Sequence, residues 1–134
     1  MLDDPRPENE PAVLVFEGGI PGFGAHRQFL LADLTDEGTF QELVCVDEPG
    51  LALVVASPWW FFPEYRPDLP EQDRAELAIG SPVDAAVFCA VVVDDDQLMM
   101  NLRAPFVVHA STHRARQVIL DEDQPMRAPV LTAT

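Results

Sequence analysis

Short apolar runs separated by turn residues make up most of the chain. The runs are rich in β-branched, leucine and aromatic residues and end near glycine, proline or aspartate, a pattern typical of strands joined by tight turns. The run from residue 85 to 93 is apolar throughout, which predicts a strand buried on both faces. Seven or eight short strands predict an all-β sandwich or barrel. The candidate strands are residues 13–16, 28–32, 40–46, 51–56, 85–93, 97–103, 106–110 and 115–120.

Three turns are marked by their own residues. Ile20-Pro21-Gly22-Phe23 suits a type II turn, because proline presets φ at the first central position and glycine supplies a positive φ at the second. Glu48-Pro49-Gly50 has similar chemistry and predicts a hairpin of residues 40–46 with 51–56. Asp94-Asp95-Asp96 is interpreted as a solvated turn.

One short helix is predicted among the strands, from Pro70 to Ala78. Proline suits a first helical position, Glu71 and Asp73 lie near the positive end of the helix, and Gly80 follows its close. The preceding residues 58–70 contain four prolines, a density that excludes a regular helix or a central strand.

The 134 residues fit a single domain, expected to span residues 12–131. Residues 1–11 carry three prolines and five acidic or amide groups and predict a flexible lead, and residues 132–134 form a tail. The first residues lack the basic and apolar regions of a signal peptide. The longest apolar run, 85–93, is well below the about 20 residues that a membrane helix needs. We therefore expect a soluble cytoplasmic protein.

Acid dominates the charge of the chain. Eight Lys+Arg stand against 23 Asp+Glu, a net charge of −15, and every one of the cations is arginine. Such a surface repels phosphate, which disfavours direct binding of RNA or DNA, and it favours encounter with a basic protein. An alternative of equal weight is that the acid only keeps the protein soluble.

No pattern of catalytic or metal-binding residues stands out. Cys45 and Cys89 lie in separate apolar runs and are expected to be buried free thiols. His109 and His113 fall at a strand end and a turn, where they cannot share a helix face as metal ligands. No nucleophile elbow, phosphate-binding loop or dinucleotide fingerprint occurs. We predict no enzyme activity, cofactor or metal site, although a carboxylate pair assembled in space would not be visible in a sequence.

The aromatic segment Pro58-Trp59-Trp60-Phe61-Phe62-Pro63-Glu64-Tyr65 holds five of the eleven aromatic residues (8 Phe, 2 Trp, 1 Tyr). On a strand, Trp59 and Phe61 would share one face, and Trp60 and Phe62 the other. One pair could enter the core and leave the other as an exposed interaction surface. Alternatively, both pairs are buried, one of them beneath residues 66–80.

Five motifs follow one another along the chain: Phe16-Glu17-Gly18-Gly19-Ile20-Pro21-Gly22-Phe23, Leu43-Val44-Cys45-Val46-Asp47-Glu48-Pro49-Gly50-Leu51-Ala52-Leu53, Phe61-Phe62-Pro63-Glu64-Tyr65, Asn101-Leu102-Arg103-Ala104-Pro105-Phe106-Val107-Val108 and Gln117-Val118-Ile119-Leu120. In series they resemble the FliW family of flagellar assembly factors. No single motif is specific, but their order and spacing are kept from about residue 13 to residue 131. The resemblance implies a small antiparallel β-barrel-like fold, to which the sequence adds one short helix.

The resemblance also implies a function in partner switching. FliW proteins bind CsrA, a small dimeric protein that represses translation of flagellin mRNA, and they also bind flagellin. Accumulated flagellin occupies the FliW protein and frees CsrA to stop synthesis, and flagellin export reverses this. The chain is therefore expected to antagonise CsrA allosterically, away from the RNA surface, with no nucleic acid or membrane contact of its own.

The chain departs from the family in its first residues and in several side chains. The family usually has an extra strand before the Phe16 region, but residues 1–11 are too rich in proline to resemble one. The barrel is then expected to be open at that edge or paired differently. Cys45 replaces the usual serine, Leu53 the usual phenylalanine, and Trp59-Trp60 is bulkier than is common.

Seven residues are nominated for partner contact, most of them aromatic or acidic. Asn101 has an alternative structural role, because its side chain could satisfy backbone groups in a bend. A Tyr65→Ala variant is expected to keep its fold and lose CsrA or flagellin. The nominated residues are Phe23, Trp60, Phe62, Tyr65 and Asn101, with Asp47 and Glu48 as flanking acids.

Three other functions make different structural predictions. A small-ligand-binding barrel, with Trp59 or Trp60 lining the pocket, requires a deep apolar cavity. An enzyme with a carboxylate dyad requires two carboxylates about 5–10 Å apart in a cleft. A structural subunit of an assembly would associate with itself and would not bind CsrA.

Overall fold

The computed structural model describes residues 12–121 and 123–130. The predicted lead (1–11) and tail (132–134), and the last residue of the predicted domain, lie outside the described residues. Nine strands account for most of the ordered structure: β1 (Ala12–Phe16), β2 (Gln28–Asp33), β3 (Phe40–Cys45), β4 (Ala52–Ala56), β5 (Ala85–Asp94), β6 (Gln97–Met100), β7 (Phe106–His109), β8 (Arg114–Gln117) and β9 (Ala128–Pro129).

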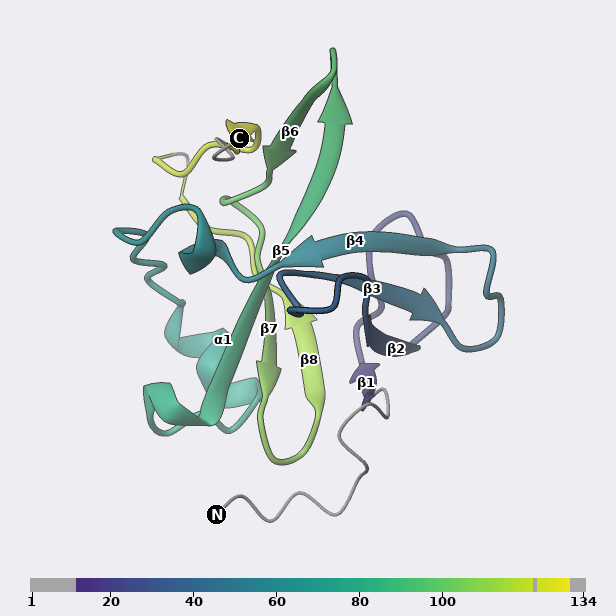
Figure 1. Ribbon diagram of the computed structural model, residues 1–134. Coiled ribbons are helices and arrows are strands. Elements are labelled where there is room, and N and C mark those ends of the chain that lie inside the picture. The colour runs from purple at the N-terminus through teal and green to yellow at the C-terminus, as the bar shows by residue number, and fades with distance from the viewer. Residues whose placement is uncertain (1–11, 122, 131–134) are drawn as a thin grey trace.

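Seven of these strands close into a ring in the order β4-β3-β2-β1-β8-β7-β5, and β5 then pairs with β4 (Figure 1). The predicted all-β, barrel-like fold is therefore confirmed. All pairings are antiparallel except that of β1 with β8, which is parallel from Val15↔Arg114 to Phe16↔Ala115. Through this parallel pair β1 has a partner on each edge, so the barrel is paired differently there and is not left open. Strands β6 and β9 extend the sheet beyond the ring.

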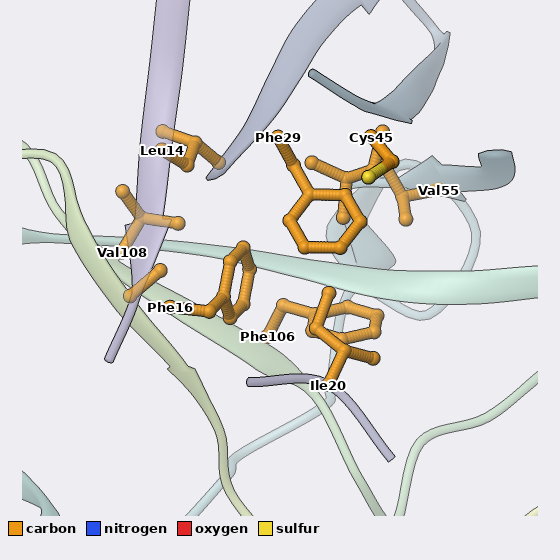
Figure 2. Packing of buried hydrophobic residues seen from close by; sticks show 10 residues of the cluster. Leu14, Phe16, Ile20, Phe29, Cys45, Val55, Phe106 and Val108 are labelled. Carbon is orange, nitrogen blue, oxygen red and sulfur yellow. The ribbon is translucent and has the colours of Figure 1, made fainter. Parts of the chain in front are cut away.

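The interior of the barrel is filled by side chains from all around the ring (Figure 2). Phe16 stands edge-on to both Phe29 and Phe106, with ring centroids 5.6 and 5.8 Å apart. Leu14, Leu43, Val55 and other buried side chains complete this cluster. Since each fully buried side chain of this size is worth roughly 1.5–3 kcal/mol, the interior is the main source of stability.

Strand β5 lies between this interior and a second apolar layer outside the barrel. Ala86, Phe88 and Ala90 pack against the interior cluster, whereas Val87, Cys89 and Val91 belong to two outer clusters. The prediction that this strand is buried on both faces holds as far as Val91. It is wrong for Val92 and Val93, which are 53% and 70% exposed, because the pairing of β5 with β4 stops at Val54↔Val91.

The segment between β4 and β5 covers the outer layer. It contains the short 3-10 helices η1 (Pro58–Trp60) and η2 (Pro82–Asp84) and the helix α1 (Glu71–Glu76). The predicted helix is confirmed but shorter, with Pro70 as its N-cap instead of its first turn. Its end also differs from expectation, because Ala78 adopts the left-handed conformation (φ 58°) that the sequence predicted for a glycine.

The three predicted turns form, although Gly50 does not adopt the positive φ that a type II turn would give it. Gly22 has φ 91°, and the Phe23 amide donates to the Ile20 carbonyl at 2.9 Å, as in a type II turn. The hairpin of β3 and β4 runs from Phe40↔Ala56 to Val44↔Ala52, closed by the Leu51 amide donating to the Glu48 carbonyl at 2.8 Å. Asp95 and Asp96 both have positive φ, as a two-residue hairpin turn requires.

The aromatic segment does not form the strand that its alternation suggested. Pro58–Trp60 is a 3-10 helix, and the Phe62 amide donates to the Pro58 carbonyl at 2.8 Å. Consequently the two tryptophans are exposed together, and Phe61 and Phe62 turn together toward the outer cluster. The pairing of alternate residues was wrong because four prolines within 58–70 prevent an extended ladder.

Candidate functional site

The nominated residues fall into two groups at opposite ends of β4. Phe23, Asp47 and Glu48 lie in the turns before β4, and Trp60, Phe62 and Tyr65 follow it, together with Asn101. A five-residue strand spans roughly 17 Å, so the two groups do not form one compact site.

The first group brings two turns side by side at one end of the barrel. The Val46 amide donates to the Gln28 carbonyl at 3.0 Å, and His26 Nε2 lies 3.1 Å from Glu48 Oε1. Asp47 and Glu48 are exposed, as flanking acids should be. Phe23 is half-buried, with its ring 5.6 Å from that of Phe29, so it closes this end of the core.

The second group is centred on Trp60, which is the most exposed aromatic residue described, at 63%. Its neighbour Trp59 is 40% exposed, and its indole Nε1 donates to the Tyr65 carbonyl at 3.0 Å. That bond and the 5.9 Å contact between the Trp59 and Tyr65 rings fix the segment against the barrel. The exposed indole of Trp60 therefore stands on a rigid base, which suits an interaction surface.

Tyr65 is buried and cannot itself touch a partner in this conformation. It is 6% exposed, and its hydroxyl donates to the Leu102 carbonyl at 2.7 Å. Burial, followed by the neighbouring Cys89 thiol, raises the pKa of the Tyr65 phenol. Burial likewise raises the pKa of Cys89 to about 12, although the hydrogen bond with Tyr65 opposes that rise. The pair forms a buried polar contact beneath the aromatic segment.

Asn101 serves the bend between β6 and β7. Its Oδ1 accepts hydrogen bonds from the backbone amides of Arg103 and Ala104 at 3.0 and 3.1 Å. This is the structural role that the sequence left as an alternative. The bend allows β6 and β7 to lie along the same edge of β5.

A groove of about 480 Å³ runs beside the aromatic segment, outside the barrel. Trp59, Leu69 and Ile79 are among its apolar walls, and Arg66 and Arg74 line it as well. Its opening is broad, and the barrel interior is filled (Figure 2). The deep apolar cavity that a ligand-binding barrel requires is therefore not found in the interior, although Trp59 does line this open groove.

Carboxylates and arginines meet between α1 and β8. Arg116 lies 2.9 Å from Asp73 and 3.3 Å from Glu76, and Arg114 lies 2.8 Å from Glu17. The Arg114 guanidinium also donates to the Glu76 carbonyl at 2.9 Å. Glu17 and Glu76 share a small cleft, as a carboxylate dyad would, but each is held by arginine. The arrangement therefore serves to attach the helix to the barrel.

His109 stabilises the turn after β7. Its ring Nδ1 accepts hydrogen bonds from the Ser111 and Thr112 amides. Within residues 12–121 and 123–130, no three His, Cys, Asp or Glu side chains gather as a metal site would need. No helix in the same ranges has the length and apolar character to cross a membrane.

Sequence reasoning missed the arginine network and the groove. Arg114 and Arg116 alternate on β8, a spacing that places both on one face, which was a usable signal. The groove has no local signal, since its walls come from several separate stretches of chain. Both cysteines are buried and free, as predicted.

Comparison with known proteins gives a consistent result. The family model described as FliW protein matches residues 6–130. The flagellar assembly factor FliW of Caldicellulosiruptor saccharolyticus is 34% identical over 122 residues, which are 89% of this chain and 80% of the relative. The flagellar assembly factor FliW of Bacillus subtilis is 33% identical over 115 residues, 84% of this chain and 80% of the relative.

The fold of a solved relative agrees as well. A crystal structure of the flagellar assembly factor FliW superposes with a TM-score of 0.81 at 32% sequence identity. The matched region covers 91% of this chain and 87% of that chain.

Proposed function

Since this chain belongs to the FliW family, we propose that it is a flagellar assembly factor that works by binding two proteins in the cytoplasm, CsrA and flagellin. By holding CsrA it relieves repression of flagellin mRNA. By holding flagellin it gives up CsrA, so that flagellin synthesis follows flagellin export. It catalyses no reaction in this scheme.

The observation that carries the proposal is the exposed indole of Trp60 on a strongly acidic protein. Tryptophan is among the side chains that contribute most to protein interfaces, and an exposed one supported by a rigid segment costs little entropy when it binds. The net charge of −15 attracts a basic RNA-binding protein and repels RNA. An anionic protein docked on CsrA would also lower the affinity of CsrA for RNA phosphates without covering the RNA surface.

The experiment is to measure binding of CsrA and flagellin to a Trp60→Ala variant. We expect the affinity for at least one partner to fall by about tenfold or more, as for an aromatic anchor at an interface. The urea midpoint should hardly change, because the side chain is largely in solvent.

The matched control is Leu34→Ala, which removes another exposed apolar side chain (49%) from the loop between β2 and β3. It should bind both partners as the native chain does. If Trp60→Ala also binds both normally, the aromatic segment is not the contact surface.

A further inference from the structure

Strands β4 and β5 are paired over only part of their length. Their ladder runs from Ala56↔Cys89 to Val54↔Val91 and stops there. Beyond this point β5 continues upward with β6 as a hairpin, while β4 runs sideways toward its hairpin with β3 (Figure 1). The two strands therefore diverge as a fork, with the exposed residues Val92 and Val93 on one arm.

The hydrogen-bond pattern identifies which backbone groups face this fork. The Ala90 carbonyl accepts from the Asn101 amide at 3.0 Å, so even-numbered residues of β5 point their backbone groups toward β6. Odd-numbered residues point the other way, and Val91 accordingly pairs with Val54 of β4. Val93 is the next odd residue. It lies opposite Leu98 of β6, but its N–H and C=O face the fork, beyond the last described pair of β5 with β4.

On the other side of the fork, β4 also has a residue without a described partner in β5. The Leu51 carbonyl accepts a hydrogen bond from the Cys45 amide. The backbone groups of odd-numbered residues of β4 therefore point toward β3, and those of even-numbered residues point toward β5. Ala52 would be the β4 partner of Val93 if the ladder went on, but the pairing of the two strands ends two residues earlier, at Val54↔Val91. A donor and an acceptor on Val93 thus lie at a sheet edge, where the side chains of Val92 and Val93 are exposed, an arrangement that templates strand addition.

The acidic residues around the fork favour a positively charged partner. Asp95 and Asp96 form the exposed turn of one arm, and Asp47 and Glu48 the exposed turn of the other. On the first arm, Arg127 is already paired with Asp94 at 2.6 Å. Two copies of this edge would bring like charges together, which opposes self-pairing. An extended segment with arginine or lysine beside its apolar residues fits both the edge and its acids.

We propose that a positively charged partner adds a strand to β5 at Val93, within the fork between β4 and β5. This inference rests on the proposed function, for it assigns a docking mode to the basic partner. The backbone of β5 supplies affinity through ladder hydrogen bonds, the valines supply apolar contact, and the turn acids supply selectivity for positive charge.

The test uses Val93→Pro in the full chain, with CsrA of the same organism as the probe. Proline removes the Val93 N–H that faces the fork and leaves the bonds to β6 intact, so the hairpin should persist. The affinity for CsrA should fall by about tenfold, the effect of losing one ladder hydrogen bond and obstructing its neighbour. Val93→Thr keeps the N–H, the β-branch and the shape, and should bind as the native chain does.

Amide exchange in the native chain gives a second readout that does not depend on folding of a variant. In the free protein the Val93 amide should exchange faster than that of Val92, which is bonded to β6, and CsrA should slow Val93 selectively. Unchanged exchange at Val93 in a formed complex, or equal binding by a folded Val93→Pro variant, overturns the docking mode and leaves the proposed function standing.

Two other outcomes also count against the docking mode. If the native chain binds neither CsrA nor flagellin, the proposed function and the docking mode fall together. If sedimentation shows a dimer of the free chain that Val93→Pro abolishes, the fork is an interface between two copies, and the inference of a basic partner is wrong.

Discussion

At the residue scale, two nominated contact residues prove to hold the fold together. Tyr65 joins the aromatic segment to the β6–β7 bend through its bond to the Leu102 carbonyl, and Asn101 shapes that bend from within. The exposed residues Trp60, Asp47 and Glu48 are therefore the nominated ones best placed to touch a partner.

Substitutions at Tyr65 should separate packing from hydrogen bonding. Tyr65→Phe leaves the buried Leu102 carbonyl without its donor and should lower the free energy of unfolding by about 1–3 kcal/mol. Tyr65→Ala also removes the ring and should cost about 3–5 kcal/mol, contrary to the expectation that it would keep the fold intact. Urea denaturation of both variants checks this, and equal stability of Tyr65→Ala and the native chain would contradict the structure.

Asn101→Ala should destabilise the chain by about 1–2 kcal/mol, because two backbone amides lose their acceptor. Asn101→Asp keeps an oxygen at the same place and is the matched control. Thermal unfolding of the two variants should differ clearly. If Asn101→Ala unfolds at the same temperature as the native chain, then the Asn101 side chain does not shape the bend.

The Cys89 thiol should make the protein sensitive to alkali. Burial raises its pKa from the ordinary 9.0 to about 12, so as pH rises the unfolded chain loses this proton before the folded one does. Its contribution to stability is complete below pH 9 and is lost between 9 and about 12, at up to about 1.4 kcal/mol per pH unit. Urea midpoints measured across this range should fall less steeply for Cys89→Ala, and parallel curves would contradict the assignment.

At the scale of elements, local signals predicted the strands and turns well. The glycine of the type II turn and the apolar run of β5 each determine one conformation by themselves. Failures occurred where the deciding contact is distant. The parallel pairing of β1 with β8 joins Val15 to Arg114 across most of the chain, and the two-residue strand β9 pairs with β6.

Helix α1 depends on the barrel for its stability. It has six residues, and none of Glu71–Glu76 is buried, so an isolated helix of this length would not persist. Leu77, directly after it, is buried against Val87, Val107 and Val118. The pairs of Arg116 with Asp73 and Glu76 add a partly exposed contact worth about 1 kcal/mol or less.

We therefore expect Leu77→Ala to release the helix. The change should lower the free energy of unfolding by about 2–5 kcal/mol, as for a buried leucine. Hydrogen exchange of the α1 amides should become faster, while exchange of the β1–β3 amides should remain slower than that of the α1 amides. Arg116→Gln, in which only the ion pairs are lost, should show a much smaller effect. An α1 that is equally protected in both variants would assign its attachment elsewhere.

At the scale of the whole molecule, the charge and the barrel act together. Within the described residues, the barrel interior is packed with apolar side chains, and its strands carry turns rich in acid. Composition predicted this acidic character, and the aromatic segment predicted an interaction surface. Neither could predict the fork between β4 and β5, because the divergence of two strands depends on the path of the entire ring.

The most direct test of the account is a titration of the folded native chain with CsrA and with flagellin, at low and at physiological salt. We predict stoichiometric capture of each partner, with the affinity for CsrA weakening as salt screens the net charge of −15. An affinity for CsrA that does not vary with salt would show that the net charge does not contribute to CsrA binding. Failure of a folded sample to bind either protein would contradict the central claim.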